Sequence, residues 1–205
     1  MSRVELPEVS SLPPYLRSLH DGARPKDWST RHVARAFADN SDLLEKYLDF
    51  YYPYHSSAGL IDSRLKELVR LRIATLNGCK TCKAARLDPD HVSENEAASD
   101  VDNPSSGGFT PRERAALRLA EAMAVDHFAI DDPMIRELRQ HFSKGELLEL
   151  MMMTGQYIGF GRVLAILQLE ETTCPIWRAR IDVTSCDRER LRLTFLYDKI
   201  GQPDA

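Results

Sequence analysis

Two cysteines three residues apart, Cys79 and Cys82, are the residues of this sequence best suited to chemistry. They lie in the stretch Glu67 to Arg86, which predicts an amphipathic helix that stops at Asn77-Gly78 and restarts at the pair. Two thiols on neighbouring corners of a helical turn lie close enough to form a disulfide. Unpaired backbone N–H groups at the start of a helix favour the thiolate over the thiol. The spacing therefore indicates a pair capable of redox chemistry.

Three interpretations of the pair are open. In the first, one cysteine attacks a peroxide or a disulfide sulfur and the other resolves the adduct. In the second, the pair is half of a zinc site completed by Cys174 and Cys186, although these two lack the spacing of a second Cys-x-x-Cys. In the third, the cysteines are small buried hydrophobic side chains. The spacing favours the first, because such a pair in a reducing compartment is more often catalytic, redox-active or metal-binding than structural.

Charged side chains interrupt the helix that precedes the pair. Asp62 is suited to cap its start, and Arg72 lies within its apolar arc. A guanidinium in that position requires a paired carboxylate or the rim of an interface, so Arg72 predicts a partner that the sequence does not identify. Glu67 lies nearly opposite the arc, within reach of Arg64 and Arg70 at three-residue spacing, which indicates a surface ion pair.

The elements around the pair are predicted to be helices. Apolar residues recur at helical spacing after Asn40-Ser41, and Pro53 is expected to end or kink that helix. Thr110 and Ser143 each begin a capping box, and Asp132-Pro133 begins another helix. No run alternates apolar and polar residues between hairpin turns, and no repeat recurs at a fixed period. The sequence therefore predicts an all-α protein.

A cluster of aromatic and polar side chains lies near Pro53 and consists of Tyr51, Tyr52, Tyr54 and His55. Such a cluster can line a pocket, but it is more often the edge of a packed core, which is what we expect here. Before it, the proline-rich residues 1–30 are expected to hold at most one short helix.

The most apolar run extends from Leu147 to Leu169. Polar residues within it favour a buried or interface helix over a membrane span; they are Glu149, Gln156, Arg162 and Gln168. Because residues 147–153 are apolar nearly all round, the helix is expected to be central or shared with another subunit. Three glycines, each costing about 1 kcal/mol relative to alanine in a helix, indicate a close approach to the backbone or a local break; they are Gly155, Gly159 and Gly161. A cofactor or substrate could come close there, but tight helix packing is what we expect.

Length and charge limit the classes of function. The 205 residues are enough for one substantial core. A net charge of -4, from 27 Lys+Arg and 31 Asp+Glu, provides no strong field for nucleic acid or an anionic membrane, so a small molecule or a protein is the expected partner. Residues 1–20 lack a charged start followed by an apolar secretion core, which favours a cytoplasmic protein.

Several strings together resemble a known family. The sequence contains Leu65-x-Glu67-Leu68-Val69-Arg70-Leu71-Arg72, then Asn77-Gly78-Cys79-x-x-Cys82, then residues 109–117 and Glu149-Leu150 through Gly161-Arg162. Over about residues 60–170 these strings are similar to the alkylhydroperoxidase D (AhpD)-like, carboxymuconolactone decarboxylase superfamily. The specific features are Glu67, twelve residues before Cys79, and the order of the capped helices.

This resemblance implies an all-helical, oligomeric AhpD-like bundle whose redox members reduce hydroperoxides. It assigns attack on the peroxide to Cys82, formation of the disulfide to Cys79 and membership of a proton relay to Glu67. Reducing equivalents would come from a dithiol carrier, such as a lipoylated or thioredoxin-like protein.

Two positions depart from the family pattern, which has histidines directly before the second cysteine and four residues after it. Here those positions hold Thr81 and Arg86. Arg86 could stabilise a Cys82 thiolate one helical turn away, but it cannot shuttle protons at neutral pH. Three other histidines could substitute in space, although each is more typical of a surface or core edge; they are His55, His91 and His127.

We therefore predict a cytoplasmic thiol-dependent peroxidase or disulfide oxidoreductase with Cys79, Cys82, Glu67 and Arg86 as its catalytic residues. The expected partners are a hydroperoxide or other small-molecule substrate, a dithiol reductant and further copies of the chain, without cofactor, metal, nucleic acid or membrane. The alternatives are a lactone decarboxylase-like lyase, whose chemistry does not depend on Cys-x-x-Cys, and a non-catalytic redox sensor or interaction protein.

The predicted organisation is one globular domain in three parts. Residues 1–60 form an N-terminal helical extension packed on the core, residues 61–170 form the AhpD-like core, and residues 171–205 form a C-terminal tail.

Overall fold

The computed structural model describes residues 2–25, 27–93, 96–97 and 108–169. Over these residues the chain forms eight α-helices and no strand, within one compact unit that spans Met1–Glu170. The predicted all-α class is thereby confirmed. The predicted tail at 171–205, which includes Cys174 and Cys186, lies outside the described residues, and the boundary at residue 60 stays a prediction.

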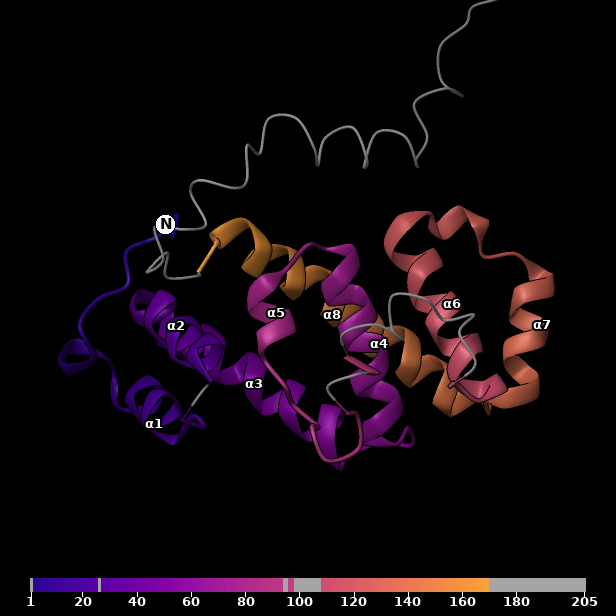
Figure 1. Ribbon diagram of the computed structural model, residues 1–205, viewed down its shortest axis with the longest axis horizontal. Helices are drawn as coiled ribbons and strands as arrows, with labels where there is room; N and C mark the ends of the chain where they lie inside the picture. The colour runs from indigo at the N-terminus through magenta and orange to yellow at the C-terminus, as the bar shows by residue number, and fades with distance from the viewer. Residues whose placement is uncertain (1, 26, 94–95, 98–107, 170–205) are drawn as a thin grey trace, which may run out of the picture. The chain divides into compact units, whose positions relative to one another are not determined.

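The helices are α1 Pro14–Gly22, α2 Trp28–Ala36, α3 Ser41–Ser56, α4 Ser63–Leu76, α5 Lys80–Ala84, α6 Pro111–Val125, α7 Asp132–His141 and α8 Lys144–Leu167. Short 3-10 turns occur at Val9–Ser11 (η1), Ala38–Asn40 (η2) and His127–Ala129 (η4). Figure 1 shows α1 and α2 at one end of this unit and α6 and α7 at the other, with α4 between them and α3 leading toward the middle. The long helix α8 contacts α4, α5, α6 and α7, and α5 also contacts α2 and α4.

Local capping sets the starts of several helices. Asp62 accepts a hydrogen bond from the Leu65 N–H at 2.9 Å, as predicted for α4. Thr110 and Ser143 form complete capping boxes at the starts of α6 and α8. Asp131 caps α7, which begins at the predicted Asp132-Pro133. These starts were predictable because their partners lie within one helical turn.

Pro53 does not end α3. The helix continues through Pro53 to Ser56, so that part of the prediction was wrong. A proline removes only its own N–H from the helical ladder, while its carbonyl remains an acceptor. Here the Pro53 carbonyl accepts hydrogen bonds from Ser57 N at 3.1 Å and Ala58 N at 2.7 Å, which close the final turn.

Helix α4 is the buried centre of the fold. Every residue from Leu65 to Ala74 is buried, because α3, α5, α6 and α8 all contact the helix. The prediction of a single apolar arc with Glu67 on the opposite, solvent-facing side was therefore wrong, and the Glu67 side chain is 0% exposed. A charged group in such a position requires a partner within the protein.

Other charges of α4 are paired with residues distant in the sequence. Arg72, predicted to require a carboxylate or an interface, contacts Glu121 of α6 at 3.1 Å. Lys66, only 1% exposed, contacts Glu149 of α8 at 2.9 Å and donates to the Ala58 carbonyl at 2.9 Å. These pairs join α4 to the two long helices beside it.

Helix α8 buries one face and leaves apolar side chains on another. Its buried residues include Leu150, Tyr157 and Gly161, whereas Leu148 and Met152 are each 58% exposed. Among the described residues this helix alone is long and apolar enough to cross a membrane, by length and composition only. The core helix of a soluble protein meets the same criteria, and α8 packs against α4 and α6.

The glycines of α8 have different surroundings, which gives a matched pair of predictions. A Cβ at Gly161 would lie 2.8 Å from Asn77 Nδ2 and 3.7 Å from Cys82 Sγ, whereas a Cβ at Gly159 would meet nothing within 4 Å. We expect Gly161→Ala to lower the free energy of unfolding by about 1–3 kcal/mol through overpacking. Gly159→Ala should raise it by up to about 1 kcal/mol, since alanine favours the helix. Urea unfolding of both variants checks this, and equal effects would contradict it.

Candidate active site

The cysteine pair follows a tight turn between α4 and α5. Asn77 is the C-cap of α4, and Gly78 adopts a φ of +60°, which glycine tolerates better than other residues. Cys79 then caps the start of α5, with its sulfur accepting a hydrogen bond from Cys82 N at 3.1 Å. The predicted stop at Asn77-Gly78 and restart at the cysteines are confirmed.

The two cysteines form a disulfide with an S–S distance of 2.02 Å. They differ in accessibility, because Cys79 is 0% exposed whereas Cys82 is partly exposed and lines a cavity. The sulfur of Cys82 also lies 3.9 Å from the Gly161 carbonyl of α8. A small molecule that enters the cavity therefore reaches Cys82 first.

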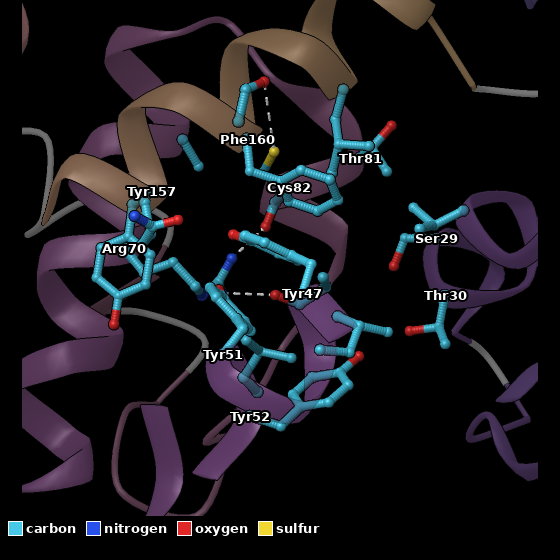
Figure 2. A pocket seen from close by; sticks show the side chains of 18 of the residues that line it. Ser29, Thr30, Tyr47, Tyr51, Tyr52, Arg70, Thr81, Cys82, Tyr157 and Phe160 are labelled. Carbon is cyan, nitrogen blue, oxygen red and sulfur yellow. Dashed lines mark hydrogen bonds between the residues drawn. The ribbon is translucent and has the colours of Figure 1, made fainter. Parts of the chain in front are cut away.

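The cavity beside Cys82 has a volume of about 80 Å³ and mostly apolar walls. Its aromatic lining includes Tyr47 and Phe160, whose ring centroids are 4.5 Å apart, together with Tyr51. Figure 2 shows these rings around Cys82, with Arg70 reaching toward the cysteine backbone. The cavity can accommodate an apolar group next to the disulfide.

This cavity corrects the expectation for the aromatic cluster of α3. Tyr51 and Tyr52 line the cavity, although we expected a packed core edge. Tyr54 is 42% exposed, and His55 is buried at 2% exposure, where its ring stacks on Tyr51. The sequence does not separate these cases, because the other wall comes from α8, about 100 residues later.

Glu67 lies at the centre of a buried hydrogen-bond network and not on the surface. Its carboxylate accepts two hydrogen bonds from the Arg70 guanidinium, at 2.7 and 2.8 Å, and one from Leu87 N at 3.2 Å. Burial alone would disfavour the carboxylate, but the Arg70 charge and hydrogen bonds outweigh it and hold the pKa of Glu67 well below its ordinary value. Glu67 is therefore an anion at neutral pH.

Arg86 contacts this network from the segment after α5. We expected Arg86 to lie one helical turn after Cys82. Helix α5 instead ends at Ala84 and Ala85 is extended, so Arg86 lies outside the helix that contains Cys82. Its Nε lies 3.7 Å from Glu67 Oε1, and its Nη2 donates to the Val92 carbonyl at 2.6 Å. Direct stabilisation of a Cys82 thiolate by Arg86 stays a prediction.

Of the three histidines considered from the sequence, His55 is the one whose described contacts reach Glu67. Its Nε2 lies 3.2 Å from Glu67 Oε2, and its Nδ1 lies 2.9 Å from the Tyr157 hydroxyl. His91 instead pairs with Asp88 at the surface, and the ring of His127 packs against Phe128. Burial lowers the pKa of His55 more than Glu67 raises it, which favours the neutral imidazole.

This burial predicts a loss of stability in mild acid. The pKa of His55 is lower in the folded protein than the ordinary value of 6.5, so the unfolded chain binds the proton more readily. The contribution of neutral His55 to the free energy of unfolding is therefore fully present above about pH 6.5. It is lost as the pH falls below that value, by up to about 1.4 kcal/mol per pH unit. Urea unfolding between pH 7.5 and 5 measures it, and His55→Gln should flatten the profile. A profile unchanged by that substitution would contradict the prediction.

Within the described ranges no three His, Cys, Asp or Glu side chains are placed to hold a metal ion. Thr81 occupies the position at which the AhpD-like pattern has a histidine, and it is buried and lines the cavity. Sequence reasoning missed the central place of Arg70, although its three-residue distance from Glu67 was the available signal.

Comparisons with known proteins find similar solved structures but no similar sequence family. No protein-family model and no curated protein sequence matches the chain. Among solved structures, the chain is similar to an alkylhydroperoxidase AhpD core, an uncharacterized peroxidase-related protein from Ralstonia eutropha JMP134, with a TM-score of 0.69 and 18% identity over 82% of this chain and 91% of that one. A peroxidase-related protein from Silicibacter sp. TM1040 gives a TM-score of 0.65 and 18% identity over the same shares.

A third structure, a protein of unknown function from Agrobacterium tumefaciens named as a candidate antioxidant defence protein AhpD, gives a TM-score of 0.53 and 22% identity over 64% of this chain and 90% of that one. At these identities the comparisons establish the fold. The AhpD-like helical fold implied by the sequence resemblance is confirmed.

Proposed function

We propose that this chain, which has the AhpD-like fold, is a thiol-dependent peroxidase or disulfide oxidoreductase that works through Cys79 and Cys82. One observation carries the proposal, the disulfide between a buried Cys79 and a Cys82 that lines an apolar cavity. This arrangement separates a nucleophile that a substrate can reach from a resolving thiol that it cannot reach. The apolar walls favour an organic hydroperoxide over hydrogen peroxide.

The reaction begins with the reduced pair. The Cys82 thiolate attacks the terminal peroxide oxygen, an S–O bond forms, the O–O bond breaks, and the alkoxide takes a proton to leave as an alcohol. Cys79 then attacks the Cys82 sulfenic acid, the disulfide forms and water leaves. Two electrons pass from the thiols to the peroxide. An external dithiol, such as a lipoylated or thioredoxin-like protein, returns them by thiol–disulfide exchange.

The resemblance assigns Glu67 to a proton relay, but the geometry supports a different role better. A carboxylate with a pKa held well below its ordinary value is a poor proton donor at neutral pH. Glu67 is instead placed to orient Arg70, and Arg86 adds a second guanidinium beside the same carboxylate. We propose that Glu67 and Arg86 act on Cys82 indirectly, through the hydrogen-bond network that includes Arg70.

Stoichiometric oxidation tests the function. The reduced protein should lose two of its four thiols, those of Cys79 and Cys82, on mixing with one equivalent of cumene hydroperoxide, and it should turn over continuously when dihydrolipoamide is added. Thiol titration and peroxide assays measure the two steps, with hydrogen peroxide as the comparison substrate. A reduced protein that keeps both thiols in the presence of excess organic hydroperoxide would rule out the peroxidase.

We also propose that the protein forms a homo-oligomer through the exposed apolar face of α8. Leu148, Met152 and Ile166 on this helix are 58%, 58% and 59% exposed, and exposed apolar side chains along one helix are typical of an interface. Met152→Glu is expected to lower the molar mass measured by light scattering. Leu43→Glu, at a residue 55% exposed on α3, is the matched control and should leave the molar mass unchanged. A monomeric wild-type protein would contradict the proposal.

A further inference from the structure

Arg70 contacts both the Glu67 carboxylate and the backbone of Cys82. Besides its two hydrogen bonds to Glu67, its Nη1 donates to the Cys82 carbonyl at 2.6 Å and its Nη2 donates to the Ala85 carbonyl at 2.5 Å. Figure 2 shows the hydrogen bond between Arg70 and Cys82 as a dashed line. One buried side chain of α4 thus holds the backbone of the accessible cysteine.

The end of α5 explains why these contacts are needed. The helix has only five residues and ends at Ala84, where the chain becomes extended. Carbonyl groups in the last turn of a helix require donors from outside the helix, and a cation is favoured there. Arg70 supplies both the donors and the positive charge. Its planar fork bridges the carboxylate and the two carbonyls, a geometry that the point charge of lysine does not reproduce.

The network carries a net positive charge beside Cys82. Two guanidiniums, Arg70 and Arg86, accompany one carboxylate, Glu67, and His55 is neutral above its lowered pKa. The other titratable groups around the pair include the cavity tyrosines Tyr47, Tyr51, Tyr52 and Tyr157, the cations Lys80, Lys83 and Arg162, and the carboxylate of Asp88, which interacts electrostatically with Glu67. At neutral pH the tyrosines are uncharged, and these three cations outnumber the one added anion. A thiolate at Cys82 therefore faces an excess of positive charge.

We propose that Arg70 is the positioning residue of the cysteine pair, fixing the backbone of Cys82 at the cavity and stabilising its thiolate, with Glu67 orienting the guanidinium. The proposal rests on the proposed function, because it takes Cys82 as the nucleophile. It assigns to an arginine of α4 an electrostatic contribution that the resemblance does not provide.

Alkylation of Cys82 in a Cys79→Ser background tests this proposal. The rate of reaction with iodoacetamide is followed from pH 5 to 10 for that background and for Arg70→Met, Arg70→Lys, Glu67→Gln and Arg64→Gln added to it. Arg64 is the matched control, since it lies on the same helix and pairs with Glu96 and Glu113 at 2.8 Å each. Far-UV circular dichroism verifies that each variant folds.

Arg70→Met and Glu67→Gln should change the alkylation rate of Cys82 in opposite directions. Arg70→Met is expected to raise the pKa of the Cys82 thiol by about one unit and to slow alkylation at pH 7 about tenfold. Glu67→Gln should accelerate alkylation at pH 7, because it removes the negative charge while the amide oxygen still accepts a hydrogen bond from Arg70 and keeps the guanidinium oriented. Arg70→Lys should restore part of the rate, and Arg64→Gln should match the background.

Two results would overturn the proposal, namely a profile unchanged by Arg70→Met or slower alkylation in both Arg70→Met and Glu67→Gln. If Arg70→Met fails to fold, the proposal stands or falls on Arg70→Lys and Glu67→Gln. The alkylation assay contains no peroxide. The expected profiles in a protein without peroxidase activity would therefore refute the proposed function and still support the role of Arg70.

Discussion

Replacing Cys82 by serine is expected to reduce the turnover of an organic hydroperoxide by a factor of about 10³ or more. The reason is that Cys82 lines the cavity whereas Cys79 is 0% exposed, so Cys79 cannot take over the attack. Peroxide consumption in the presence of excess dihydrolipoamide measures the loss.

Cys79→Ser provides the matched comparison. This variant should reduce one equivalent of peroxide per chain and then stop as a sulfenic acid at Cys82, because the resolving thiol is missing. Trapping with dimedone and mass spectrometry identify the oxidised residue. A single turnover in Cys82→Ser and none in Cys79→Ser would reverse the assigned roles.

Replacing Lys66 by methionine is expected to lower the free energy of unfolding by about 3–5 kcal/mol. The substitution leaves the Glu149 carboxylate, 10% exposed, without its cation, which contacts it at 2.9 Å in the native protein. The carboxylate also accepts hydrogen bonds from Leu60 N and Ile61 N, so it cannot leave the site without breaking them. Urea unfolding at pH 7 measures the loss.

Two variants separate burial from charge in this experiment. Lys46→Met removes the lysine of an exposed pair with Asp42, whose side chains are 70% and 78% exposed, and should change stability by less than about 1 kcal/mol. Adding Glu149→Leu to Lys66→Met should recover part of the loss, because no unpaired buried charge remains. Equal effects of Lys66→Met and Lys46→Met would show that burial of the pair does not matter.

The parts of the fold that the sequence predicted depend on local interactions. Thr110, Ser143 and Asp62 each bond to a backbone N–H three residues later, so their patterns could be recognised within one turn. The break at Gly78 is likewise a property of one residue and its φ of +60°. The family resemblance added the fold because the order of these caps is distinctive.

The surroundings of α4 could not be predicted in the same way. Helical periodicity indicates which residues share a face, but not how many neighbouring helices cover the others. Glu67 was therefore expected at the surface, whereas four helices contact α4 and bury it. The partners of Arg72 and Lys66 are Glu121 and Glu149, more than 45 residues away, and spacing alone does not identify them.

The candidate site, like the fold, could be predicted only in part from the sequence. The cysteines and Glu67 were located from their spacing, whereas the cavity required helices brought together from distant parts of the chain. Phe160 of α8 and Tyr47 of α3 lie 4.5 Å apart in space although more than 100 residues separate them in the sequence. Pocket lining by the tyrosines of α3 was therefore underestimated.

The walls of the cavity have a consequence for thermodynamic linkage. Leu19, Thr30 and Tyr47 come from the first 60 residues, whereas Cys82 and Phe160 come from the part that follows. A molecule that contacts both walls binds only while the N-terminal helices pack against the rest of the unit, so it stabilises this packing by RT ln(1 + [L]/Kd). At a ligand concentration 100-fold above Kd this amounts to about 2.7 kcal/mol. Protection of the N-terminal helices from proteolysis would thus report occupancy of the cavity even for a ligand that never reacts.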